Sequence, residues 1–212
     1  MVKLIFFGTP TFAVPSLLKL LGSPHEVTAV VTQPDRPRGR GHRVSESPVK
    51  QIASRHSVQI LQPQKMKDPL FLDILKNLKP DLGVVAAYGK ILPEQVLAIP
   101  SHGMINVHAS LLPRYRGAAP IQRAVMAGET TTGITIIRLV LEMDAGPMLR
   151  KASHPILPND TSETLERTLS ELGATTLMET IGDLAKGLDS TEPQNEHLVT
   201  FAPRLSKDEG LI

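Results

Sequence analysis

Residues 2–31 read VKLIFFGTPTFAVPSLLKLLGSPHEVTAVV, and this opening stretch decides the class of fold that we expect. Residues 2–7 are a β-rich apolar run that ends at a glycine, which is typical of a buried strand. The pattern over residues 11–21 favours a helix, and the β-branched run at 26–31 favours a second strand. A strand, a helix and a strand within about 30 residues form a right-handed βαβ unit with parallel strands.

The rest of the chain continues this alternation. Helices are expected at 49–55, 69–78, 119–127 and 161–185, and strands at 59–61, 82–87 and 104–107. Two further strand patterns, 133–140 and 147–153, flank a turn that contains Asp144 and Gly146, which indicates an antiparallel pair. We therefore expect a Rossmann-like, doubly wound, mostly parallel α/β sheet with an antiparallel addition near the C-terminal half.

Composition narrows the functional classes. The chain has 212 residues, of which 41% are hydrophobic and 21% charged, as in one folded globular domain with at most a short appendage. Aromatic residues make up only 3%, so stacking on nucleic-acid bases is not expected as its main binding device. The lack of cysteine excludes disulfides and thiol nucleophiles and fits a reducing, cytoplasmic location. Apolar runs are too short for a signal segment or a membrane span.

One local concentration of positive charge stands out against a net charge of only +2. It lies in residues 33–48, which contain three prolines and two glycines and are predicted to form a long, mobile surface loop. Composition alone leaves two interpretations open: a solvated connection, or a loop that contacts phosphates. The basic and titratable residues of this segment are Arg36, Arg38, Arg40, His42 and Arg43.

The segment INVHASLLPRYRGAAPIQRA, residues 105–124, holds the candidate chemistry. Asn106 and His108 stand two residues apart at the end of a buried strand, so their side chains share one side of the backbone. An amide can polarise a carbonyl oxygen, and an imidazole can carry a proton near neutral pH. Asp144 could orient that imidazole. Spacing alone favours a structural hydrogen-bonded pair and an aspartate that only forms a turn.

The stretch NVHASLLPRYRGAAPIQ resembles the signature of the folate-dependent formyltransferases, in which Asn-x-His at a strand end precedes Ser-Leu-Leu-Pro and an essential Asp follows. FGTPTFAVPSL, VVTQPDRPRGRG, AAYGKILP and TTGITI extend the resemblance over nearly the whole chain. FGTP and QPDRPRGRG are similar to the branch that acts on methionyl-tRNA. Ala109 stands where the purine branch tends to have proline, whereas Pro147 departs from an aspartate frequent in the tRNA branch.

The resemblance implies transfer of a formyl group from 10-formyltetrahydrofolate to the amino group of initiator methionyl-tRNA. It implies catalytic roles for Asn106, His108 and Asp144. It places folate beside two segments, and tRNA at four arginines of the basic loop. The folate residues are Tyr88, Gly89, Ile91, Leu92, Ser110, Leu111, Leu112 and Pro113, and the tRNA residues are Arg36, Arg38, Arg40 and Arg43.

Two alternatives stay open: a formyltransferase acting on a sugar nucleotide or purine precursor, and a non-catalytic folate- or RNA-binding module. Scattered histidines give no metal-binding pattern, so no metal is expected. We expect a catalytic domain over residues 1–189. Residues 190–212 are expected to be a polar linker toward a C-terminal OB-like domain that the resemblance implies and this chain lacks. We also expect a monomer.

Overall fold

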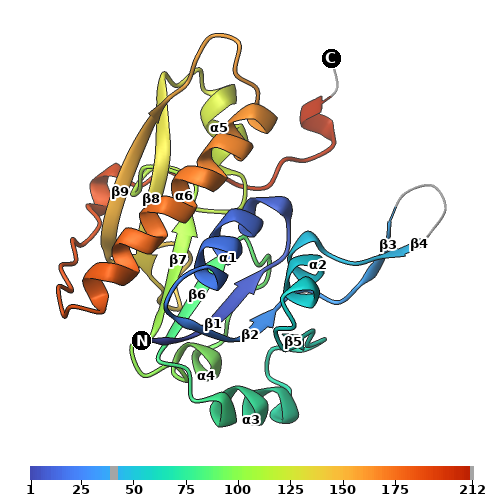
Figure 1. Ribbon diagram of the computed structural model, residues 1–212. Helices are drawn as coiled ribbons and strands as arrows, with labels where there is room; N and C mark the ends of the chain where they lie inside the picture. The colour runs from blue at the N-terminus through green and yellow to red at the C-terminus, as the bar shows by residue number, and fades with distance from the viewer. Residues whose placement is uncertain (39–42, 211–212) are drawn as a thin grey trace.

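The computed structural model describes residues 1–38 and 43–210, with the backbone alone at residues 36–38, 43, 44 and 210 (Figure 1). The strands are β1 Lys3–Gly8, β2 Glu26–Val31, β3 Arg36–Arg38, β4 Arg43–Ser45, β5 Ile60–Leu61, β6 Leu82–Ala86, β7 Met104–His108, β8 Thr131–Arg138 and β9 Met148–Pro155. The α-helices are α1 Val14–Leu21, α2 Pro48–Arg55, α3 Pro69–Leu78, α4 Glu94–Leu97, α5 Pro120–Met126 and α6 Ser162–Leu184. Short 3₁₀ helices cover Thr11–Ala13, Glu196–Leu198 and Asp208–Gly210.

The described residues form a seven-stranded sheet in the order β5-β2-β1-β6-β7-β8-β9. Strands from β5 to β7 pair in parallel, and β8 and β9 continue the sheet antiparallel. The predicted mostly parallel sheet with an antiparallel addition is therefore confirmed. The chain leaves β1 toward β2 and β5, and returns to the other side of β1 with β6 and β7. In open α/β sheets, ligands bind outside the carboxyl ends of the strands at such a switch point, which here directs attention to the ends of β1, β6 and β7.

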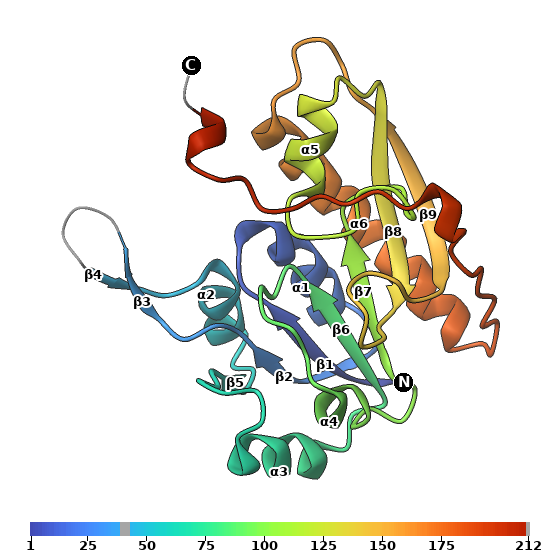
Figure 2. The same cartoon turned by 180° about the vertical axis from the view of Figure 1, so that it is seen from behind.

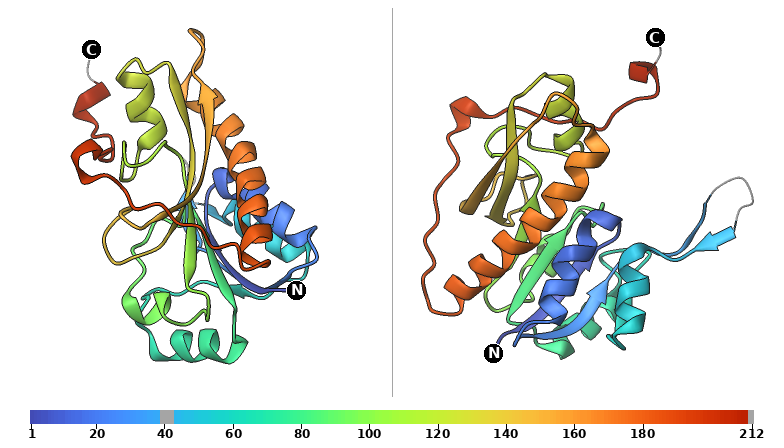
Figure 3. Two further views of the ribbon diagram at one scale, coloured as in Figure 1. Left: turned by 90° about the vertical axis from the view of Figure 1, so that its left-hand side faces the viewer. Right: turned by 45° about the horizontal axis from the view of Figure 1, so that its top comes forward.

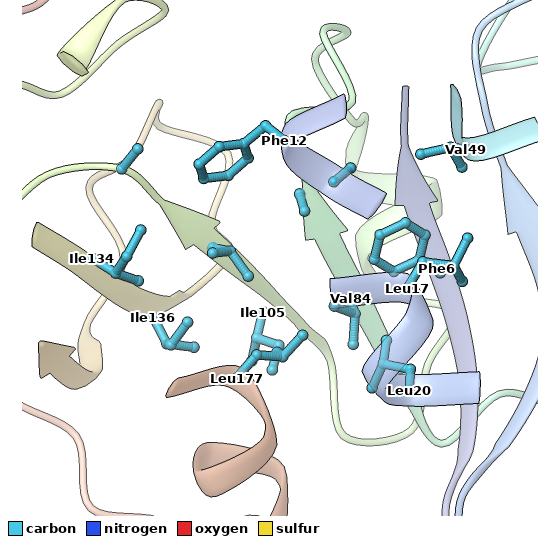
Figure 4. Close-up of a cluster of buried hydrophobic side chains, with 14 of the residues drawn as sticks. Phe6, Phe12, Leu17, Leu20, Val49, Val84, Ile105, Ile134, Ile136 and Leu177 are labelled. Carbon is cyan, nitrogen blue, oxygen red and sulfur yellow. The ribbon is translucent and has the colours of Figure 1, made fainter. Parts of the chain in front are cut away.

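Alternation along the strands divides the core between the two faces of the sheet. On β1, Leu4 and Phe6 join a buried cluster under α1 and α6, whereas Ile5 and Phe7 join a second cluster under α3 and α4. Figure 4 shows the first cluster, with Phe6 beside Leu17 and Leu20 of α1. Because both faces of the central strands are covered, these strands are apolar throughout, as a parallel sheet requires.

Local sequence signals set the helix boundaries. Helices α2 and α3 begin with a proline at the first position, and each is preceded by a side chain that caps it. The Ser47 hydroxyl accepts from the Lys50 backbone N–H, and the Asp68 carboxylate accepts from that of Leu70. At α6, Thr161 is the N-cap and forms a capping box, which satisfies backbone donors at the helix start.

The basic segment differs from the irregular loop predicted for residues 33–48. Its backbone forms an antiparallel pair in which Arg36 is opposite Ser45, Pro37 opposite Val44 and Arg38 opposite Arg43. Proline is compatible with such a two-stranded ribbon because an open edge needs no backbone donor. The ribbon extends away from the main sheet (Figure 3). The predicted tRNA residue Arg40 lies outside the described residues.

The chain after α6 crosses the face of the sheet that lies opposite this helix (Figure 2, Figure 3). We call residues 189–203 the C-terminal strap. Glu192 forms an antiparallel bridge with Met148, Phe201 forms a parallel bridge with Arg116, and Ala202 is fully buried. The strap is thus packed onto the domain, while the predicted connection of residues 190–212 to a further domain stays a prediction. No helix within the described ranges is long and apolar enough to cross a membrane.

Candidate active site

Strand β7 carries the Asn-x-His motif to the edge where the parallel strands end. Ile105 and Val107 point into the cluster under α1 and α6, so alternation directs Asn106 and His108 to the opposite face. That face is the one that the C-terminal strap crosses. The His108 side chain is only 5% exposed, so its polar atoms must find partners within the protein or in a ligand.

Asp144 approaches this pair from the turn between β8 and β9. Its φ of +52° is in the left-handed region, which aspartate adopts more readily than most residues. Its Oδ2 accepts a hydrogen bond from the Gly117 backbone N–H at 2.9 Å, and its Oδ1 lies 3.5 Å from Asn106 Nδ2. The same carboxylate lies 3.6 Å from His108 Nδ1, measured from Oδ2. The structure therefore brings the three residues with predicted catalytic roles together.

The two ring nitrogens of His108 both face oxygen atoms. Nε2 lies 2.9 Å from the Tyr115 carbonyl oxygen, and Nδ1 faces the Asp144 carboxylate. The Tyr115 carbonyl oxygen only accepts, so this hydrogen bond requires a proton on Nε2, and Nδ1 then faces Asp144. The site thus places an imidazole, a carboxylate and an amide side by side.

The loop after β7 is held in place by the neighbouring strand. The Thr135 hydroxyl on β8 donates to the Ser110 carbonyl at 2.7 Å and accepts from the Leu112 backbone N–H at 3.0 Å. The Ser110 hydroxyl donates to the Arg114 carbonyl at 2.6 Å, which closes the loop on itself. These bonds fix the position of the Tyr115 carbonyl beside His108. The loop thereby contributes to the geometry of the imidazole.

The side chain of Tyr115 anchors the outer side of this loop. Its hydroxyl donates to Glu129 at 2.6 Å, and the Arg114 guanidinium pairs with the same carboxylate. The Tyr115 hydroxyl, followed by Arg114, holds the pKa of Glu129 below its ordinary value. Burial, followed by the hydrogen bond to Glu129, raises the pKa of Tyr115, so its hydroxyl keeps its proton near neutral pH.

Arg116 is almost fully buried beneath the C-terminal strap, with 2% of its side chain exposed. Its Nε donates to Gln194 Oε1 at 2.9 Å, and its two terminal nitrogens donate to Glu196 at 2.8 and 3.3 Å. Two hydrogen bonds from one guanidinium to one carboxylate suit the planar geometry of arginine. The hydrogen bond from Arg116 lowers the pKa of Glu196.

We expect Gly146→Ala to destabilise the fold by about 1–3 kcal/mol, as overpacking generally does. A β-carbon at this position would lie 1.7 Å from the backbone oxygen of Arg138, so the turn that carries Asp144 would have to open. Thermal or urea unfolding measures the change. The matched control is Gly182→Ala in α6, where the new β-carbon meets nothing within 4 Å and alanine favours the helix. Equal stability of the two variants would contradict this prediction.

The chain is similar to known proteins over most of its length. Residues 2–181 match the family described as formyl transferase. The chain belongs to this family. Methionyl-tRNA formyltransferases from Pseudomonas syringae pv. syringae and Geobacter sulfurreducens are 51% and 48% identical to it. Each alignment covers 100% of this chain and 67% of the relative, so the chain spans about two thirds of their length.

Solved structures of other formyltransferases share the fold at much lower sequence identity. A glycinamide ribonucleotide transformylase from Symbiobacterium toebii is 21% identical, with a TM-score of 0.74 over 92% of this chain and 95% of that one. An N-formyltransferase from Helicobacter canadensis, solved with folinic acid and dTDP-3-aminofucose, is 20% identical, with a TM-score of 0.76 over 96% and 71%. The shared fold of the family therefore spans enzymes with different acceptors, and the fold alone does not select one.

The folate segment that the family resemblance predicts after β6 offers mainly backbone. Tyr88 is buried, its hydroxyl donates to Met66 Sδ at 3.3 Å, and burial raises its pKa to about 12. Leu92 is also buried, whereas the Ile91 side chain is 82% exposed. Gly89 has a φ of +80°, which glycine adopts without strain. Ligand contacts here would use main-chain groups and Ile91.

The other predicted folate residues lie directly after His108. Ser110 and Leu112 are buried, while Leu111 and Pro113 are half-buried. Of the predicted tRNA residues, Arg36, Arg38 and Arg43 lie on the β3–β4 ribbon, described by their backbone. The ribbon follows β2, and in the sheet β1 and β6 lie between β2 and β7.

Other parts of the described chain lack comparable chemistry. Among those residues, no group of three or more His, Asp or Glu side chains is arranged to hold a metal ion. A hollow lined by Lys76, Lys79, Asp81 and Gln95 lies near the amino end of β6, at the opposite edge of the sheet from His108. It contains no amide and imidazole pair, so geometry favours the carboxyl edge as the active site.

Sequence reasoning missed three residues that build this site: Tyr115, Arg116 and Gln194. Tyr115 and Arg116 stand inside the quoted signature, but their contacts arise only when the loop folds over His108. Gln194 is part of a polar segment with no motif. No local signal identifies it, because its partners are 48 to 78 residues away in the chain.

Proposed function

We propose that this chain transfers the formyl group of 10-formyltetrahydrofolate to the amino group of initiator methionyl-tRNA. One observation carries the proposal: Asn106, His108 and Asp144 converge at the carboxyl edge of the sheet. They do so in a chain about 50% identical, over its whole length, to methionyl-tRNA formyltransferases. The solved formyltransferases named for glycinamide ribonucleotide or solved with dTDP-3-aminofucose are only 20–21% identical, so the comparisons support these alternative acceptors less.

In the proposed reaction, the neutral amine attacks the formyl carbon. The C–N10 bond to the folate then breaks, and the amine proton passes to the leaving nitrogen or to solvent. The intermediate carries a negative oxygen, and stabilising that oxygen lowers the barrier most. An amide has two N–H donors, so Asn106 can contact Asp144 and still donate to this oxygen. His108 lies beside this oxygen and stabilises it as a cation or as a hydrogen-bond donor. A free α-amino group has a pKa of about 8, so no strong base is needed.

Asp144 has two tasks in this proposal. Its Oδ2 faces His108 Nδ1 and thereby orients the imidazole at the reacting centre. Its position between His108 and the Gly117 N–H also keeps the carboxylate at the reacting centre, where it can relay a proton through water. Both tasks depend on an ionised carboxylate.

The folate is proposed to lie along the carboxyl ends of β1, β6 and β7. The segment Tyr88–Leu92 lines one side of this position, and residues 110–113 line the other. The Thr9 hydroxyl and the Gln33 amide both donate to the Tyr88 carbonyl, at 3.1 and 2.9 Å, so the segment is fixed before a ligand arrives. Fixed backbone groups bind a ring with little loss of conformational entropy.

The direct test is an assay of formyl transfer from 10-formyltetrahydrofolate to charged initiator tRNA. Glycinamide ribonucleotide and an amino sugar nucleotide serve as competing acceptors in parallel reactions. We expect transfer to the tRNA alone. Faster transfer to either small acceptor would replace the proposed substrate, and folate binding without transfer to any of them would support the non-catalytic alternative.

We also propose that arginines of the basic ribbon contact tRNA phosphates, as the family resemblance implies for Arg36, Arg38, Arg40 and Arg43. Replacing Arg38 and Arg43, which pair across the ribbon, by glutamine should raise KM for the tRNA. Fewer phosphate contacts release fewer counterions, so the slope of log affinity against log salt should fall by about 1–2. Binding of a folate analogue should be unchanged, since the ribbon follows β2, which β1 and β6 separate from β7 in the sheet.

The control for this prediction removes the same charge elsewhere. Lys76 and Lys186 are exposed, on α3 and just after α6, and the double replacement by glutamine should leave the salt slope close to that of the parental chain. If both double variants change the slope equally, the effect reflects net charge alone, and the ribbon is then a solvated connection.

A further inference from the structure

The side chain of Gln194 joins the C-terminal strap to the turn that carries Asp144. Its Nε2 donates to two backbone carbonyls of this turn, Asp144 O at 2.7 Å and Gly146 O at 2.8 Å. Its Oε1 accepts from Arg116 Nε at 2.9 Å. The amide therefore uses both N–H donors on one short turn and its oxygen on a buried guanidinium.

The orientation of this amide is determined by its partners. A guanidinium only donates, so the atom facing Arg116 must be the amide oxygen, and the NH₂ group must face the two carbonyls. Arg116 itself is held by the strap, because its backbone N–H donates to Thr200 O at 2.9 Å and its carbonyl accepts from Ala202 N–H at 2.7 Å. Arg116 thus fixes the orientation of the Gln194 amide, so that its NH₂ group faces the turn.

The turn needs such support. Asp144 has a φ of +52°, and its neighbour Ala145 makes only a long backbone bond, 3.4 Å, to Glu142 O. A left-handed residue in a surface turn persists where the surroundings hold it. The two bonds from Gln194 bracket this strained residue, one at Asp144 and one at Gly146. They hold the backbone from which the carboxylate reaches Gly117 and His108.

We propose that Gln194 is a positioning residue for formyl transfer, which acts by holding the backbone of the Asp144 turn so that the carboxylate meets His108. The strap is then part of the active site although it carries no group that touches the substrate. This inference rests on the proposed function for its kinetic consequence, but its structural part can be tested separately.

Two variants separate this role from a structural one. Gln194→Glu retains an acceptor for Arg116 and removes both donors to the turn. Gln194→Met has a similar volume and removes all three bonds. If Gln194 only satisfied the buried Arg116, the Glu variant would be as active as the parental chain. If it positions Asp144, both variants lose activity.

We expect both variants to lower kcat for formyl transfer by about 10-fold to 100-fold, because small misplacements of a catalytic group are costly. KM for the folate should change less than about twofold, since the segments proposed to contact folate, residues 88–92 and 110–113, do not belong to the strap. Glu192→Gln is the control: it alters an exposed side chain of the strap whose backbone bridge to Met148 remains. It should keep the parental kcat.

A spectroscopic readout does not depend on activity. The Gly117 backbone N–H donates to Asp144 Oδ2 at 2.9 Å, so its amide proton resonance reports the position of the carboxylate. We expect this resonance to move in Gln194→Glu and to stay in Glu192→Gln. An unmoved resonance, or parental kcat in Gln194→Glu, would overturn the positioning role. A parental chain without formyl transfer would overturn the proposed function, and the Gly117 resonance would still decide the role of Gln194.

Discussion

Replacing His108 by alanine is expected to lower kcat for formyl transfer by about 100-fold to 10,000-fold, the range typical of a positioned acid or base. The imidazole is buried at the end of β7, where it faces Asp144 Oδ2 and the Tyr115 carbonyl. In the proposed reaction, the imidazole acts on the oxygen of the tetrahedral intermediate rather than on the bound folate. Steady-state kinetics should therefore show a lower kcat with little change in KM for the folate.

The control for this variant is His102→Ala. His102 is exposed just before the amino end of the same strand, where its ring is far from the carboxyl edge. This variant should keep parental kinetics, and its unfolding curve provides the reference for His108→Ala. If the His108 variant kept more than a tenth of the parental kcat, the imidazole would not have the proposed catalytic role.

Asp144→Asn should reduce kcat by at least about 100-fold while the turn keeps its shape. In the parental chain, Oδ2 accepts from the Gly117 backbone N–H and faces His108, and Oδ1 faces the Asn106 NH₂ group. An asparagine must direct its own NH₂ group at one of these donors, and it also lacks the negative charge that faces His108. Whichever carboxylate oxygen the NH₂ group replaces, the N–H donor that faced this oxygen loses its acceptor.

Glu142→Gln is the matched control, because it removes one negative charge from the same turn at an exposed side chain. It should change kcat little, which separates the contact of Asp144 with His108 from the general potential of the turn. Single-turnover measurements with saturating folate would place the Asp144→Asn defect in the chemical step. A defect of similar size in Glu142→Gln would show that general charge, and not this contact, matters.

Much of the fold was predictable because its signals are local. The strand at 26–31 and the helix at 69–78 begin and end where the pattern places them. Apolar periodicity, proline at a helix start and capping side chains act over a few residues, so one sequence contains them in full. The pairing of β3 with β4 was not predicted, because prolines and glycines hide a short pairing whose register depends on the opposite strand.

The candidate site divides in the same way. Strand alternation places Asn106 and His108 on one side of β7 from the sequence alone. Their distances to Asp144 depend on how β8 pairs with β7 and how the following turn folds back, 38 residues later in the chain. Spacing names the candidates, and the pairing of the strands decides whether they meet.

The sequence by itself determined the βαβ opening, the mostly parallel sheet and the strand that carries Asn106 and His108, because each follows from neighbours in the chain. Only the tertiary structure decided that Arg116 is buried and that Gln194 reaches the Asp144 turn. Arg116 and Gln194 are 78 residues apart in the sequence, and Gln194 and Asp144 are 50 residues apart. Hydrogen bonds between such distant segments form only after the hydrophobic faces have packed and set the geometry. The strap is polar and has no periodicity, so its own sequence contains no signal that predicts these bonds.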